Sequence, residues 1–173
     1  MEKPEILLES RLFHIERLRP TSQTGQPLIR DIIRHPGAVV VLPILDDGRV
    51  VLIRNSRIAV DRQLLELPAG TLEPNEPPIE CARRELIEET GYRCDKIEPL
   101  TEFFSSPGML DERMYVFLAT GLTEGEMALE EGEEIEVEIF TLAETLDMIK
   151  DGTIEDGKTV ASILYYRAFC MDA

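Results

Sequence analysis

The chain has 173 residues, of which 43% are hydrophobic and 30% charged, values typical of a globular protein and not of a disordered one. Its 18 basic and 34 acidic residues give a formal net charge of −16, so neither a nucleic acid nor a membrane is expected as a partner. The three cysteines form no C-x-x-C pair and the N-terminus has no apolar leader, which together predict a reduced, soluble, cytoplasmic protein.

Residues 1–35 predict a small N-terminal β unit. Alternating or mixed segments at 5–19 and 28–35 flank the turn sequence TSQTGQP, which is typical of a hairpin or a small sheet. Such a unit has too few apolar residues to be stable alone, so it must pack on the main body or on a second chain. Residues 36–173 are expected to form the main domain.

The main domain begins with strands and ends with helices. The predicted strands lie in 37–45, 50–54, 63–70, 96–106, 112–120 and 134–141, and the predicted helices in 78–90, 142–152 and from Asp156 onward. The last helix is expected to bury Val160, Ile163, Leu164 and Ala168. Strands before and after one helix, with more helix at the end, predict a mixed sheet between helices, an α/β/α fold.

The helix over 78–90 carries an unfavourable charge distribution. Glu85, Glu88 and Glu89 lie three and four positions apart near its C-terminus. Each like-charge pair costs about 0.2–0.5 kcal/mol, and a carboxylate there loses roughly 0.3–1 kcal/mol against the helix dipole. A solvated acidic face and a cation site are the two interpretations of this pattern.

The surrounding residues resemble the Nudix family. The family pattern G-x5-E-x7-R-E-U-x-E-E-x-G-U, where U is bulky and apolar, is matched by Gly70, Glu76, Arg84, Glu85, Leu86, Glu88, Glu89 and Gly91. Tyr92 replaces the usual aliphatic residue at the last position. The resemblance implies the Nudix α/β/α sandwich with a mixed sheet, plus the N-terminal β unit, and hydrolysis of a nucleoside diphosphate linked to another moiety.

The same resemblance implies a metal site. Glu85, Glu88 and Glu89, with the carbonyl of Ala69, would bind Mg²⁺ or Mn²⁺, the hard cations that oxygen ligands suit. Arg84 would orient the glutamates, and Glu76 would brace the loop before the helix. Bound metal ions would neutralise the acidic cluster toward a pyrophosphate and activate the attacking water.

Within the family, the sequence is most similar to the ADP-ribose pyrophosphatase group. Pro107, in SSPG, lies sixteen residues beyond Gly91, as in that group. Arg57, Arg30 and Glu112 match substrate-side positions of the group. In these enzymes the N-terminal region is shared across a homodimer, and an aromatic residue there stacks on adenine. Phe13 is the best candidate for that residue, and a place in the core is the alternative.

The resemblance places the catalytic base on a late acidic loop. Alignment on the strand IEVEIF points to Glu131, with Glu133 and Glu134 as rivals. The substrate is expected to be ADP-ribose or a related nucleoside diphosphate sugar. The alternatives are GDP-mannose or another nucleotide sugar as substrate, and a catalytically silent Nudix-fold binding module.

Overall fold

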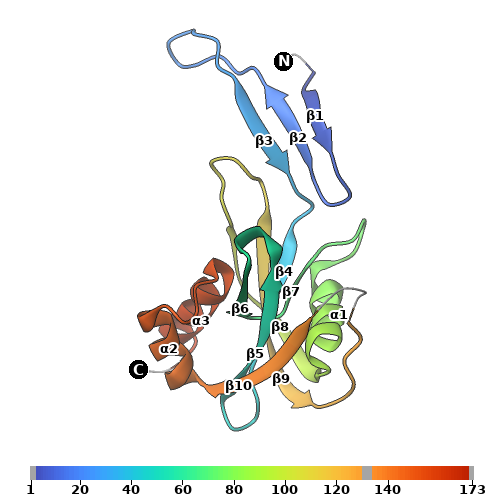
Figure 1. Cartoon of the computed structure of the whole chain (residues 1–173), viewed down its shortest axis with the longest axis vertical. Helices are drawn as coiled ribbons and strands as arrows, with labels where there is room; N and C mark the ends of the chain where they lie inside the picture. The colour runs from blue at the N-terminus through green and yellow to red at the C-terminus, as the bar shows by residue number, and fades with distance from the viewer. Residues whose placement is uncertain (1–2, 130–133, 172–173) are drawn as a thin grey trace.

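The N-terminal region is a three-stranded antiparallel sheet that projects from the rest of the molecule (Figure 1). The computed structural model describes residues 3–129 and 134–171. The sheet consists of β1 (Glu5–Glu9), β2 (His14–Leu18) and β3 (Arg30–Arg34), in that order. The small β unit predicted from the sequence is therefore confirmed. The boundary that we drew after residue 35 stays a prediction.

Two further sheets form the body. One has the order β7-β4-β9-β8 and the other the order β10-β5-β6. Their strands are β4 (Ala38–Pro43), β5 (Arg49–Arg57), β6 (Arg62–Glu66), β7 (Ala69–Thr71), β8 (Arg93–Phe104), β9 (Arg113–Thr123) and β10 (Ile135–Thr141). The pair β4–β9 is parallel, whereas β4–β7 and β8–β9 are antiparallel. The predicted mixed sheet is confirmed.

Helices cover both sides of these sheets (Figure 1). Helix α1 (Pro78–Thr90) lies on one side, and α2 (Leu142–Asp151) and α3 (Gly157–Phe169) lie on the other. Successive side chains of β4 point to opposite faces, so Val40 and Leu42 pack in the core under α2 and α3 while Val39 and Val41 pack in the core under α1. The α/β/α architecture is confirmed.

The ends of α1 follow from local sequence. Pro78 occupies the first helical position, where its missing N–H leaves no intrahelical bond unmade. Gly91 ends the helix with φ of 74°, a left-handed conformation that glycine adopts without a Cβ clash. The helix therefore runs over 78–90, as predicted, with Ala82 and Leu86 fully buried.

The expected buried stripe of α3 is partly wrong. Ile163 is buried and Val160 is half-buried, but Leu164 and Ala168 are exposed. The helix instead buries Thr159 and Ser162 and packs Tyr166 on the core, so its inward face runs along residues 159, 162, 163 and 166. Thr159 can face inward because it accepts a hydrogen bond from the N–H of Leu67. No helix within 3–129 and 134–171 has the length and apolar character required to cross a membrane.

Candidate functional site

Two of the three helix glutamates face the interior. Glu85 and Glu89 are only 8% and 3% exposed, whereas Glu88 is half-buried. The residues of β7 contact both buried carboxylates. The backbone N–H of Ala69 donates a 2.8 Å hydrogen bond to Glu89 Oε2. A Cβ added to Gly70 would lie 1.8 Å from Glu85 Oε1, so only glycine leaves room for that carboxylate.

Arg84 joins the acidic residues of the motif. Its guanidinium donates to Glu76 at 2.9 and 3.1 Å, to Glu85 at 2.7 Å and to Glu88 at 2.8 Å. These charge-assisted bonds fix the carboxylates of the helix and the loop before it in one network. This arrangement agrees with the expected orienting role of Arg84 and the bracing role of Glu76.

The network shifts the titration of its members. The hydrogen bonds from Arg84 lower the pKa of Glu76 to about 2, and those to Glu76 raise the pKa of Arg84. Burial raises the pKa of the neighbouring Cys81 thiol to about 12, so this cysteine stays protonated. Glu76 therefore remains a carboxylate down to acidic pH.

The donor chemistry of this cluster fits a divalent cation. Carboxylate oxygens from Glu85, Glu88 and Glu89 lie on adjoining faces of α1, and they are the ligands that Mg²⁺ and Mn²⁺ take. Within the part of the chain that the structure describes, no three His, Cys, Asp or Glu side chains converge as a preformed metal site. The reason is that Arg84 holds Glu85 and Glu88 while the Ala69 amide holds Glu89.

A second charged cluster lies at the end of β5, and sequence reasoning identified only one of its members. Arg57 donates two hydrogen bonds, of 2.8 and 2.6 Å, to the carboxylate of Glu66. Lys158, from α3, also donates to Glu66 and lies 2.9 Å from Asp156. Glu66 is 1% exposed. A charged residue inside the apolar run QLLELPAG was the only signal for this cluster in the sequence.

Burial and charge oppose each other at Glu66. Burial disfavours its ionised form, but the hydrogen bonds from Arg57 and the charge of Lys158 outweigh that effect and lower its pKa. The bonds to Glu66 raise the pKa of Arg57, and the charges of Glu89 and Asp156 raise it further. Arg57 therefore lies within electrostatic reach of Glu89 on α1, which is compatible with the expected phosphate-binding role.

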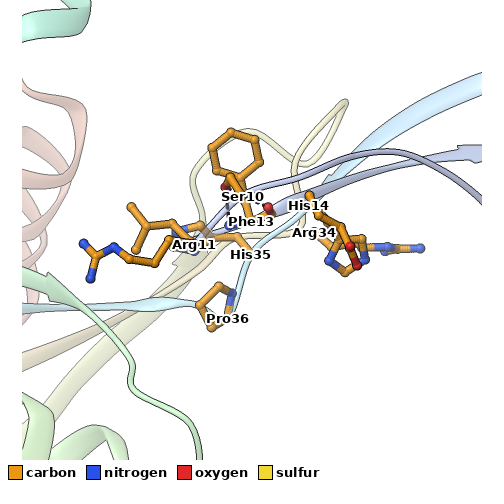
Figure 2. Close-up of a pocket in the computed structure, with 9 residues that line it drawn as sticks. Ser10, Arg11, Phe13, His14, Arg34, His35 and Pro36 are labelled. Carbon is orange, nitrogen blue, oxygen red and sulfur yellow. Dashed lines mark hydrogen bonds between the residues drawn. The ribbon is translucent and has the colours of Figure 1, made fainter.

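A pocket of about 570 Å³ lies where the N-terminal sheet meets the body (Figure 2). Its lining comes from the turn between β1 and β2 and from the end of β3 with the following link. The lining residues are Glu9, Ser10, Arg11, Leu12, Phe13, His14, Arg34, His35 and Pro36. Phe13, the expected adenine-stacking residue, is thus in a pocket and not in the core.

The loop that contains Pro107 is hydrogen-bonded to β3 beside the same pocket. The N–H of Ile33 donates to the Met109 carbonyl at 2.9 Å, and the N–H of Asp111 donates to the Ile33 carbonyl at 3.2 Å. Glu112, another expected substrate residue, has its carboxylate 3.4 Å from His35 Nδ1. The tertiary structure therefore brings Phe13, Glu112 and the Pro107 loop into one region.

The remaining expected site residues are Arg30 and the three glutamates of the late acidic loop. Arg30 is exposed at the start of β3, the end opposite the link to β4, and its guanidinium donates to the Ile29 carbonyl. Glu134 is exposed just before β10. Glu131 and Glu133 lie outside the described residues. The roles of all four stay predictions.

Comparison with known proteins agrees with this geometry. The sequence model of the NUDIX domain matches residues 34–163. The chain is 41% identical over 143 residues to an ADP-ribose pyrophosphatase of Bacillus subtilis (strain 168), covering 82% of this chain and 77% of that one. It is 38% identical over 165 residues to a methanol dehydrogenase activator of Bacillus methanolicus, covering 94% and 89%.

Two more relatives extend the comparison. The chain is 37% identical over 158 residues to a GDP-mannose pyrophosphatase of Yersinia pestis, covering 86% of this chain and 79% of that one. The crystal structure of an ADP compounds hydrolase superposes with a TM-score of 0.81 at 24% identity, covering 96% of this chain and 94% of that one. At that identity the superposition supports a shared fold alone.

Proposed function

The chain belongs to the Nudix hydrolase family, and from this premise we propose that it hydrolyses the pyrophosphate bond of ADP-ribose or a related nucleoside diphosphate sugar. The products are AMP, in the case of ADP-ribose, and a sugar phosphate. The observation that carries the proposal is the single network in which Arg84 holds Glu76, Glu85 and Glu88 beside the buried Glu89.

Nudix hydrolases need a divalent metal ion, and we propose Mg²⁺, with Mn²⁺ as a substitute. Glu85, Glu88, Glu89 and the Ala69 carbonyl would hold it. When bound, the ion supplies charge neutralisation and a water of lowered pKa. The chain itself contributes the orientation of the ligands, through Arg84 and through the Ala69 N–H.

The substrate side is proposed to lie around the second cluster and the N-terminal pocket. Arg57 supplies positive charge for the phosphates in a chain whose net charge of −16 would otherwise repel them. Phe13 would stack on the base, and Glu112 and the Pro107 loop would contact the sugar side. Glu131, with Glu133 or Glu134 as rivals, is proposed as the base that deprotonates the attacking water.

We further propose a homodimer through the N-terminal sheet, with Arg30 of this sheet as a substrate-binding residue. The support is that this sheet projects from the body and exposes large apolar side chains. These side chains are Ile6, Leu7, Leu8, Leu12 and Ile29. A monomeric sheet this small gains little stability from its own contacts. A cytoplasmic location is in keeping with the three free cysteines.

A substrate panel tests the reaction. The purified chain would be incubated with Mg²⁺ and, separately, ADP-ribose, GDP-mannose and other nucleotide sugars, and the products separated by ion-exchange chromatography. We expect AMP and ribose 5-phosphate from ADP-ribose, with slower turnover of GDP-mannose. The reverse ranking would assign the GDP-mannose alternative, and no turnover of any compound would assign the silent binding module.

The methanol dehydrogenase activator supports a second candidate function, because its similarity covers 94% of the chain. In that case the chain acts on a dehydrogenase in addition to a free nucleotide. Addition of the chain to a methanol dehydrogenase assay tests this, with the Glu89→Gln variant showing whether the Nudix site is required. An unchanged dehydrogenase rate would remove this candidate.

A further inference from the structure

Glu66 is a buried carboxylate shared by two cations from distant parts of the chain. Arg57 reaches it from the adjoining strand and Lys158 from the N-terminal turn of α3. At 1% exposure, an ionised glutamate is stable only if its charge and hydrogen-bonding capacity are matched. This cluster is therefore a buried structural feature of the fold and not a surface ion pair.

The cluster is connected to the segment that holds the α1 carboxylates. Thr159, next to Lys158, accepts a 2.8 Å hydrogen bond from the N–H of Leu67. Two residues later the Ala69 N–H bonds Glu89. The N-terminal turn of α3 thus fixes the 66–69 segment, and with it Arg57 on one side and Glu89 on the other.

The second cation keeps Glu66 from being held by Arg57 alone. Lys158 also pairs with Asp156, at 2.9 Å, so the two cations and two carboxylates carry no net charge. The effect of Lys158 on Arg57 is therefore one of position, because it fixes the carboxylate to which Arg57 is bonded. The guanidinium is also held by two parallel bonds, so its remaining N–H groups keep a fixed direction.

We propose that Glu66 and Lys158 are positioning residues that orient Arg57 toward the substrate pyrophosphate. This inference rests on the proposed function, since it concerns the same substrate. It adds two residues, one of them on α3, that the Nudix motif does not include.

Steady-state kinetics with ADP-ribose and Mg²⁺ tests the proposal in four variants: Lys158→Met, Lys158→Arg, Arg57→Gln and the Arg57→Gln/Lys158→Met double variant. We expect Lys158→Met to raise KM about tenfold with kcat within about threefold, the size of a lost charged hydrogen bond. Lys158→Arg should restore most of the KM. In the Arg57→Gln background, Lys158→Met should add little, because both changes act on one interaction. Circular dichroism would establish that each variant is folded at the assay temperature.

Lys96→Met is the matched control, since Lys96 forms an ion pair with Glu98 on the exposed face of β8. A KM for folded Lys158→Met within about twofold of the parent value would overturn the proposal, as would an effect of full size in the Arg57→Gln background. Calorimetry with inorganic pyrophosphate distinguishes a failure of the proposed reaction from a failure of the proposed positioning role. If ADP-ribose is not hydrolysed but Lys158→Met still weakens pyrophosphate binding, the proposed reaction fails and the positioning role stands. If neither is observed, both fail.

Discussion

The carboxylate of Glu85 occupies the space where a side chain at residue 70 would begin. A Cβ built on Gly70 would lie 1.8 Å from Glu85 Oε1 and 1.9 Å from its Cδ. Real Cβ atoms do not make contacts this short, so the glycine of the motif is needed for the Glu85 carboxylate to lie against β7. Two motif residues separated in sequence are therefore one steric unit.

Gly70→Ala should displace Glu85 and reduce turnover by about tenfold or more, because a metal ligand displaced by an ångström loses its geometry. The measurement is kcat/KM for ADP-ribose at saturating Mg²⁺. Gly157→Ala is the control, since a Cβ at Gly157 meets nothing within 4 Å. Unchanged turnover in Gly70→Ala would show that Glu85 is not required where the structure places it.

Glu89→Gln should reduce turnover about a hundredfold or more while the chain stays folded. The amide oxygen of glutamine can still accept the Ala69 hydrogen bond, so only the charge is lost. Millimolar Mg²⁺ should raise the melting temperature of the parent chain but not of this variant, because the ion binds only the folded site. Glu98→Gln, at an exposed ion pair, is the control. An equal Mg²⁺ shift in Glu89→Gln would place the metal elsewhere.

The Glu76–Arg84 pair should stabilise the fold in a pH-dependent way. Because the pKa of Glu76 is lowered from 4.5 to about 2 in the folded chain, its contribution is complete above pH 4.5 and is lost as the pH falls toward 2. Urea denaturation of the parent and of Glu76→Gln should therefore give a larger difference in unfolding free energy at pH 7 than at pH 3. Glu102→Gln, at an exposed pair with Arg113, should change little at either pH. A difference independent of pH would contradict the assignment.

Ile6→Thr combined with Leu8→Thr should convert the proposed homodimer to a monomer. Both side chains are nearly half exposed, at 48% and 46%, and threonine keeps the preference for a strand while removing apolar surface. Sedimentation velocity measures the change. Leu164→Gln is the matched control, because Leu164 is similarly exposed, at 44%, but lies on α3 and not on the N-terminal sheet. A monomeric parent chain would refute the dimer outright.

Local sequence was sufficient for the elements whose signals are local. Pro78 and Gly91 set the ends of α1, a capping box of Thr141 and Glu144 begins α2, and both helices lie where they were predicted. The stripe on α3 was partly wrong because apolar periodicity did not identify the face that packs on the body. That face includes the polar Thr159 and Ser162, whereas Leu164 is exposed beside the buried Ile163.

The sequence by itself determined the α/β/α class, the family and the positions of the helix carboxylates, because all of these depend on spacing within short segments. Only the tertiary structure brought Glu66, Arg57 and Lys158 together, since they lie on β6, β5 and α3. It likewise placed Phe13 in a pocket whose edge is joined to the Pro107 loop by the bonds of Ile33. Contacts between distant segments depend on how sheets and helices pack, and no periodicity along the chain records that packing.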